Sequence, residues 1–189
     1  PGELYLFEQL QGFDALGLLD ARDAGVALVA TQSVELWQTL YETYAARDSH
    51  QVDADSIAAR ALANIGFNYW CRSLAAQGEI AQLQSQLQKR YSSVDNLTDR
   101  LAVMALVCRL PEVEETMREE ILQDFYAKWE QQALVIDLWF NLQAQSPITD
   151  IAGVKKLIAH PSFDLKNPNR VRSVYCAFGM LNLRRLHAL

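Results

Sequence analysis

The sequence predicts an all-α fold, an irregular α-solenoid or superhelical array of antiparallel helix pairs of the ARM/HEAT-like kind. Apolar residues recur at every third or fourth position along almost the whole chain. No run of alternating apolar and polar residues lies between turn residues, as a strand would require. The predicted helices are short to medium in length and the loops between them are short, so consecutive helices should pack antiparallel.

Apolar stripes locate the helices in chain order. They cover residues 26–44, 57–69, 80–91, 97–108, 117–129, 134–142, 151–158 and 171–178. Each stripe is typical of a helix that buries one face in a core. The stretch "WQTLYETY" has the spacing of a tetratricopeptide repeat, but no second copy follows 34 residues later, where Cys71 stands. The core stripe of an ordinary helix is therefore the favoured interpretation there.

Capping residues mark several helix ends. The polar segment 47–55 is the longest predicted loop, and Asp53 or Asp55 can cap the helix after it. Gly78 fits the left-handed position at the end of a helix. Asn96 can cap the next helix, and Asp99 three residues later resembles the end of a capping box.

Composition limits the classes of partner and compartment. The chain has 189 residues, enough for one large domain or two small ones, and half of them are apolar, which suffices for a continuous core. We expect a single helical-repeat domain over residues 1–189. A net charge of -6 and the lack of a basic run argue against nucleic-acid binding. No apolar run reaches membrane-spanning length, and the start of the chain does not resemble a signal peptide. Three widely spaced cysteines favour a reducing compartment, so we expect a cytoplasmic protein.

The motifs of common catalytic sites are missing from the sequence. His50, His160 and His187 form no HExxH pair and lie near no cysteine at zinc-ligand spacing. No GxSxG, Walker-type or GxGxxG motif is present. Cys71 and Cys108 are better interpreted as buried structural thiols than as nucleophiles. The sequence therefore predicts neither catalysis nor a metal site in this chain.

The segment "HPSFDLKNPNRVRS", residues 160–173, has an unusual density of turn residues and arginines. Pro161 should end a helix, Asn167 should cap the next one, and Pro168 should occupy its first position. Arg170 and Arg172 then lie in the first helical turn, where the helix dipole disfavours positive charge. Compensation by an ion pair with Asp164 or another carboxylate is the favoured interpretation, and contact with a ligand is the alternative.

Several segments together resemble a known family. They are "RALANIGFNYW", "DNLTDRLAVMALV", "FYAKW", "VIDLWFNLQAQSP" and "LIAHPSFDLKNPNRVRSVYCAF". In this order and spacing they resemble the C-terminal domain of bacterial-type aminopeptidase N, a zinc metallo-aminopeptidase of the gluzincin class. The resemblance covers nearly the whole chain and is strongest over residues 95–178. Ala63 and Leu138 depart from the family pattern, which commonly has a lysine at the first position and the sequence "DKW" around the second.

This resemblance implies a specific, non-catalytic role. The family's HExxH helix, its glutamate ligand, its zinc and its substrate-amine site lie in a catalytic domain that this chain does not contain. The chain resembles part of the helical domain that caps the active-site chamber, so its implied partners are the catalytic domain of its own parent chain and peptide substrates. A free-standing helical-repeat scaffold for protein–protein binding is the alternative function.

The resemblance also suggests roles for the two arginines. Positions two apart on a helix point about 200° away from each other, so Arg170 and Arg172 cannot share a face. We expect Arg170 to form an ion pair with Asp164 in the loop before the helix. Arg172 is then the candidate that faces the chamber and meets the carboxylate of a peptide, although both arginines are candidates for that role.

Overall fold

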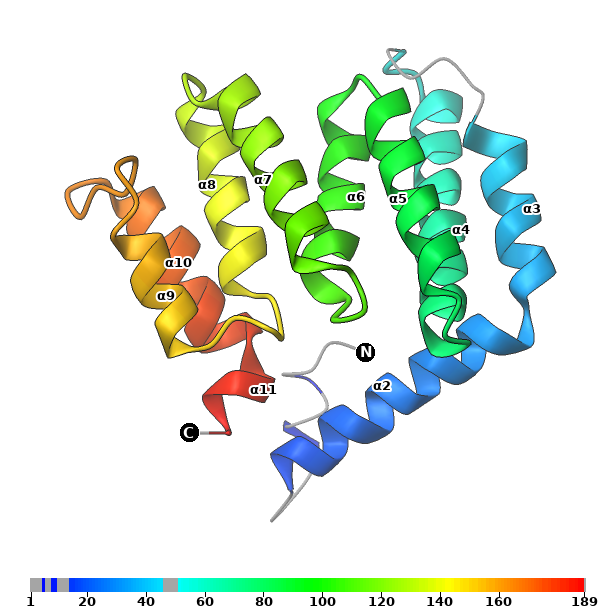
Figure 1. The fold of residues 1–189 in the computed structure, drawn as a ribbon, viewed down its shortest axis with the longest axis horizontal. Coiled ribbons are helices and arrows are strands. Elements are labelled where there is room, and N and C mark those ends of the chain that lie inside the picture. Colours follow the sequence, from blue (N-terminus) through cyan, green and yellow to red (C-terminus); the bar gives the residue numbers. More distant parts are fainter. Residues whose placement is uncertain (1–4, 6–7, 10–13, 46–50, 189) are drawn as a thin grey trace. The chain divides into compact units, whose positions relative to one another are not determined.

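The computed structural model describes residues 5, 8, 9, 14–45 and 51–188 (Figure 1). Within these residues the regular secondary structure is helical throughout, which confirms the predicted all-α class. The helices are α2 (Ala15–Gln32), α3 (Val34–Ala45), α4 (Ala54–Ala76), α5 (Ile80–Ser93), α6 (Leu97–Arg109), α7 (Glu115–Trp129), α8 (Ala133–Ala144), α9 (Ile151–Ile158), α10 (Pro168–Leu181) and α11 (Leu183–Leu186). None of the described helices is long and apolar enough to cross a membrane.

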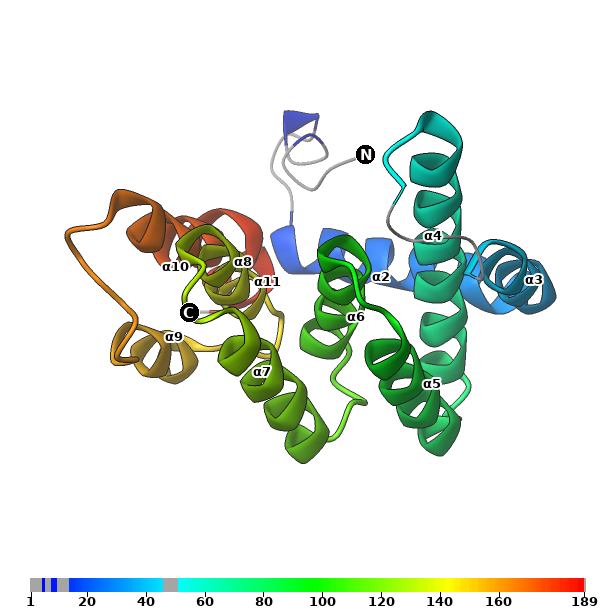
Figure 2. The same cartoon turned by 90° about the horizontal axis from the view of Figure 1, so that it is seen from above.

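The chain divides into two compact units. One unit comprises residues 27–127, and the other comprises residues 1–26 together with residues 128–189. We call the first the middle unit and the second the terminal unit. Figure 2 shows the helices of each unit from a second direction.

The middle unit is built around α4, which contacts α3, α5 and α6. Phe67 from α4, Leu83 and Leu87 from α5 and Met104 from α6 are among its fully buried side chains. Helix α3 approaches α4 closely at Gly66, where a Cβ atom would lie 2.7 Å from the backbone nitrogen of Tyr41. Only glycine permits this contact, because the backbone opposite cannot move away as a flexible side chain would.

The terminal unit is built around α8, which contacts α9 and α10. Ile136, Phe140 and Ala144 on α8 and Val174 and Ala177 on α10 are buried, and the two helices contact each other. The stripe predicted on α10 is confirmed at Val174 and Phe178, which are buried. The stripe predicted over residues 134–142 is wrong about the buried face, because Leu134 and Leu138 are 72% and 43% exposed and α10 packs on α8. At the surface of the same unit, Arg184 of α11 pairs with Asp20 at 2.7 Å and Asp23 at 2.9 Å on the first part of α2.

Predicted caps are present at the starts of α4 and α6. Asp53 and Asn96 accept hydrogen bonds from the amides of Ser56 and Asp99. Gly78 has a φ of 75°, which is the left-handed conformation expected after α4.

The stripe over residues 26–44 is divided between two helices. Helix α2 ends at Gln32, and α3 begins at Val34. The indole nitrogen of Trp37 donates to the carbonyl of Val29 at 3.1 Å, which supplies a partner for one of the last four carbonyls of α2. Periodicity alone could not find this break, because the apolar spacing continues through it.

Candidate functional site

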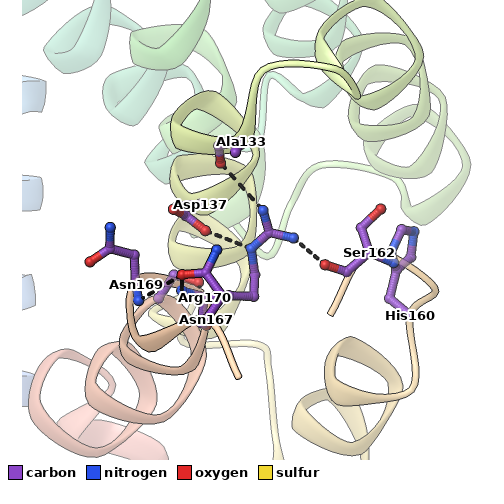
Figure 3. A network of polar contacts seen from close by, with 8 residues as sticks. Ala133, Asp137, His160, Ser162, Asn167, Asn169 and Arg170 are labelled. Carbon is purple, nitrogen blue, oxygen red and sulfur yellow. Dashed lines mark hydrogen bonds and ion pairs between the residues drawn. The ribbon is translucent and has the colours of Figure 1, made fainter. Parts of the chain in front are cut away.

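The conspicuous polar site of the terminal unit surrounds Arg170, near the start of α10 (Figure 3). Its side chain is buried, with 5% of the residue exposed. The Nε atom donates to Oδ1 of Asp137 on α8 at 2.5 Å. The two terminal nitrogens donate to backbone carbonyls, Nη1 to Ser162 and Nη2 to Ala133. Each nitrogen of the guanidinium group therefore has a partner within the protein.

Aromatic rings complete the surroundings of Arg170. Its guanidinium carbon lies 4.8 Å from the centre of the Phe140 ring, which is a cation–π contact. The imidazole of His160 lies 5.6 Å from the same ring and 5.2 Å from the ring of Trp139. Burial and the nearby Arg170 lower the pKa of His160 below its usual value. Arg170 therefore joins α8, α10 and the segment between α9 and α10, and we interpret it as a structural clamp.

The carboxylate that pairs with Arg170 is Asp137, so the expected ion pair with Asp164 is wrong. Asp164 is exposed, and its Oδ1 atom accepts the backbone N–H of Lys166 at 2.9 Å. This local turn holds the Asp164 side chain in its own loop. Asp137 lies 33 residues before Arg170 and reaches it because α8 and α10 pack together.

The start of α10 has the local structure expected of its sequence. The side chain of Asn167 accepts hydrogen bonds from the backbone amides of Asn169 and Arg170, and Pro168 is the first helical residue. Arg172 lies in the same turn but is exposed. Within the described part of the chain, no carboxylate forms an ion pair with Arg172. The two arginines thus differ in surroundings, as their angular separation on the helix requires.

Asn182 forms a second buried polar contact that the sequence analysis did not identify. Its Nδ2 atom donates to the carbonyls of Ala144, Ser146 and Thr149 at 3.2, 2.6 and 3.0 Å. Its Oδ1 atom is buried and has no hydrogen-bond partner within the described chain. The contact fixes the loop between α8 and α9 to the end of α10. An isolated polar residue within the apolar stretch "GMLNL" was the available signal.

The middle unit contains its own buried charge network, which was also missed. Arg90 of α5 lies 3.5 Å from the carboxylate of Asp99 on α6, and both side chains are 5% exposed. Asp99 also accepts hydrogen bonds from Asn64 at 2.7 Å and from Asn96 at 2.8 Å. The guanidinium of Arg90 lies 5.2 Å from the ring centre of Tyr41. This network joins α3, α4, α5 and α6.

An open hollow of about 330 Å³ lies between α5, α6 and α7 in the middle unit. Its lining includes Tyr91, Arg100, Glu120 and Asp124. The hydroxyl of Tyr91 donates to Asp124 at 2.7 Å, and the guanidinium of Arg100 lies 5.1 Å from the Tyr91 ring centre. Burial and the Asp124 carboxylate raise the pKa of Tyr91. The Tyr91 hydroxyl in this hollow is therefore protonated at neutral pH.

Two of the three thiols are buried. None of the three forms a disulfide, and Cys176 is exposed, whereas Cys71 and Cys108 are buried. Burial raises the pKa of both, that of Cys108 to about 12, so both remain protonated thiols at neutral pH. Across the described ranges no group of three or more histidine, cysteine, aspartate or glutamate side chains could hold a metal ion. The donor set described here does not fit zinc.

Comparisons with known proteins place the chain in a family. The model of a family described as "Domain of unknown function (DUF3458_C) ARM repeats" matches residues 1–189. The chain is 33% identical over 186 residues to aminopeptidase N of Escherichia coli, which covers 96% of this chain and 20% of that protein. It is 30% identical over 188 residues to aminopeptidase N of Haemophilus influenzae, covering 99% of this chain and 20% of that protein. The chain thus spans about a fifth of the length of these relatives.

A solved structure has the same fold. The crystal structure of Legionella pneumophila aminopeptidase A in complex with aspartic acid matches with a TM-score of 0.81 and 22% identity. The match covers 100% of this chain and 22% of that one. The resemblance to the C-terminal domain of aminopeptidase N is therefore confirmed. Because the family model matches the whole sequence, the chain belongs to the DUF3458_C family of ARM-repeat domains.

Proposed function

We propose that this chain is a non-catalytic helical domain that caps the active-site chamber of a zinc-dependent aminopeptidase. The parent enzyme would release N-terminal residues from peptides in the cytoplasm. The zinc ion and the catalytic groups would belong to another domain of the same parent chain. In this proposal residues 1–189 act as one helical-repeat domain, which is itself part of a larger C-terminal domain.

The observation that supports this proposal most strongly is the extent of the similarity. Nearly the whole chain aligns with aminopeptidase N, yet it corresponds to only 20% of each of the two bacterial relatives named above. Such a relation is expected of one domain in a larger enzyme.

The role of Arg172 is a further part of the proposal. The guanidinium nitrogens of Arg170 all donate to Asp137 or to two backbone carbonyls, so Arg170 cannot bind a substrate without breaking these contacts. Arg172 is exposed, two residues later on the opposite side of α10. We therefore assign the chamber-facing role to Arg172, where it would meet the distal carboxylate of a peptide.

The test compares the parent protein with this chain alone. An aminoacyl chromogenic substrate and a measurement of bound metal should show turnover and zinc in the parent, and neither in the isolated chain. Turnover by a pure preparation of the isolated chain would overturn the proposal. A natural gene product without an HExxH-containing domain would instead favour a free-standing scaffold for protein binding.

A further inference from the structure

The imidazole of His160 makes a hydrogen bond that depends on its protonation state. Its Nδ1 atom accepts the backbone N–H of Ser162 at 3.2 Å. A backbone amide nitrogen can only donate, so the ring nitrogen that faces it must be unprotonated. Figure 3 shows the imidazole of His160 beside Ser162, in the segment between α9 and α10. The observed geometry therefore belongs to the neutral form of His160.

Both backbone polar groups of Ser162 form hydrogen bonds with side chains. Its N–H bonds to His160, and its carbonyl accepts from Nη1 of Arg170. The Arg170 contact attaches the segment between α9 and α10 to α10, whereas the His160 contact lies within that segment and closes its turn. Loss of the His160 contact would therefore free the amide of Ser162 while the Arg170 contact remains.

The charges around His160 oppose a second cation. Arg170 of α10 is the nearby charge and shares Phe140 with the imidazole. On α8, Asp137 is paired with Arg170, and the uncharged rings of Trp139 and Phe140 lie beside the imidazole. In the loop, Asp164 is turned toward the amide of Lys166. On α9, Lys155 and Lys156 are exposed cations.

We propose that His160 is a proton-sensitive latch for the turn at Ser162, closed when the imidazole is neutral and open when Nδ1 is protonated. Protonation places two donors against each other at the Ser162 contact and adds a cation beside Arg170. An aromatic ring attracts a cation, which opposes release. The ring of Trp139, 5.2 Å from the imidazole, supplies such attraction, whereas Arg170 over the ring of Phe140 repels a second cation there.

The direction of the pH effect follows from these contacts. Burial and Arg170 lower the pKa of His160 in the folded protein. Above the usual histidine pKa of about 6.5 the imidazole is neutral in both folded and unfolded chains, and the closed latch is fully stable. As pH falls below that value the open form binds protons more readily, so opening becomes progressively easier until the folded pKa is passed. This inference does not depend on the proposed function.

Hydrogen–deuterium exchange of the full-length protein, measured by mass spectrometry between pH 7.5 and 5.0, tests the latch. After correction for intrinsic exchange rates, opening at Ser162 should increase by roughly threefold to tenfold in acid, as loss of one ordinary hydrogen bond predicts. Peptides from the core of α8 should change little. Equal protection of the Ser162 amide at both pH values would overturn the proposal.

Two substitutions distinguish the titration of His160 from other effects of low pH on the protein. His160→Asn keeps a side-chain acceptor for the Ser162 amide but removes the titrating imidazole. The protection of that amide against hydrogen exchange should then be independent of pH. His187→Asn removes an exposed histidine at the end of α11 and should retain the wild-type response. A pH response that persists in His160→Asn, or disappears in His187→Asn, would contradict the latch.

A direct measurement keeps the proposal testable if His160→Asn does not fold. Exchange of the imidazole C2 hydrogen, followed by mass spectrometry on the wild-type protein, reports the pKa of His160 itself. The reference is an unfolded peptide of residues 157–165. The folded protein should give the lower pKa, and an equal or higher pKa would overturn the proposal.

Discussion

The two units each bury one arginine against an aromatic ring, but the two arginines have different partners. Arg170 in the terminal unit contacts one carboxylate and two loop carbonyls. Arg90 in the middle unit contacts the carboxylate of Asp99 at 3.5 Å and the side-chain oxygen of Asn64 at 3.3 Å. Its Nε atom is buried and has no hydrogen-bond partner among the described residues.

The two sites differ in how many hydrogen-bond partners each carboxylate would retain if its arginine were replaced. Asp99 would keep hydrogen bonds from Asn64 and Asn96. Asp137 has no comparable second donor among the hydrogen bonds of the described chain, and the carbonyls of Ser162 and Ala133 would lose a donor too. A buried charge is costly mainly when its remaining partners cannot compensate it. Arg170 should therefore matter more than Arg90, although both are almost equally buried.

Replacement of Arg170 should produce the largest effect. Arg170→Ala leaves the carboxylate of Asp137, whose side chain is only 12% exposed, unpaired, so we expect the free energy of unfolding to fall by about 3–5 kcal/mol. Urea denaturation provides the measurement. Arg170→Met combined with Asp137→Leu removes both charges and should recover part of the loss. A double variant as unstable as Arg170→Ala would show that the carbonyl contacts, not the charge pair, dominate.

Replacement of Arg90 should cost less. Arg90→Met keeps much of the side-chain volume and loses one charged hydrogen-bond network, so a loss of about 1.5–3 kcal/mol is expected. The same urea measurement compares it with Arg170→Ala. A larger loss of unfolding free energy for Arg90→Met than for Arg170→Ala would show that the number of hydrogen-bond partners left to the carboxylate does not determine the loss.

The asparagine caps extend the comparison to a smaller effect. Asn167→Ala in the terminal unit removes a cap that serves two amides, and it should lower stability by about 1 kcal/mol. Asn96→Ala in the middle unit also removes a donor to Asp99, so its effect should be somewhat greater. Thermal and urea unfolding would measure both. A smaller loss for Asn96→Ala would mean that Asp99 does not need this donor.

Replacement of Arg172 should affect stability least. Arg172→Ala changes an exposed side chain, so the free energy of unfolding should stay within about 0.5 kcal/mol of the wild type. In the parent enzyme, the same variant should raise the Michaelis constant for peptides more than for single-residue chromogenic substrates, because only peptides carry a distal carboxylate. Equal changes for both substrate classes would exclude that carboxylate role.

Local features of the fold could be predicted from sequence because they depend on residues close in the chain. The stripe over residues 80–91 anticipates α5, and Asn96, Asn167 and Gly78 mark helix ends as expected. In each case the physical cause lies within one helical turn, as a cap that serves a nearby amide or a glycine that adopts a positive φ. The break between α2 and α3, within residues 26–44, could not be predicted in this way, because it involves contact of Trp37 with the preceding helix.

The sequence by itself determined that this chain forms helices, where most of them begin and end, and that Arg170 needs compensation in the first turn of α10. Only the tertiary structure decided that Asp137 supplies it, although Asp164 is much nearer in sequence. The same applies to Arg90 with Asp99 and to Asn182 with the loop after α8. Helix propensity and capping are set by neighbours in the chain, whereas the partner of a buried charge is chosen by which helices pack together to exclude water.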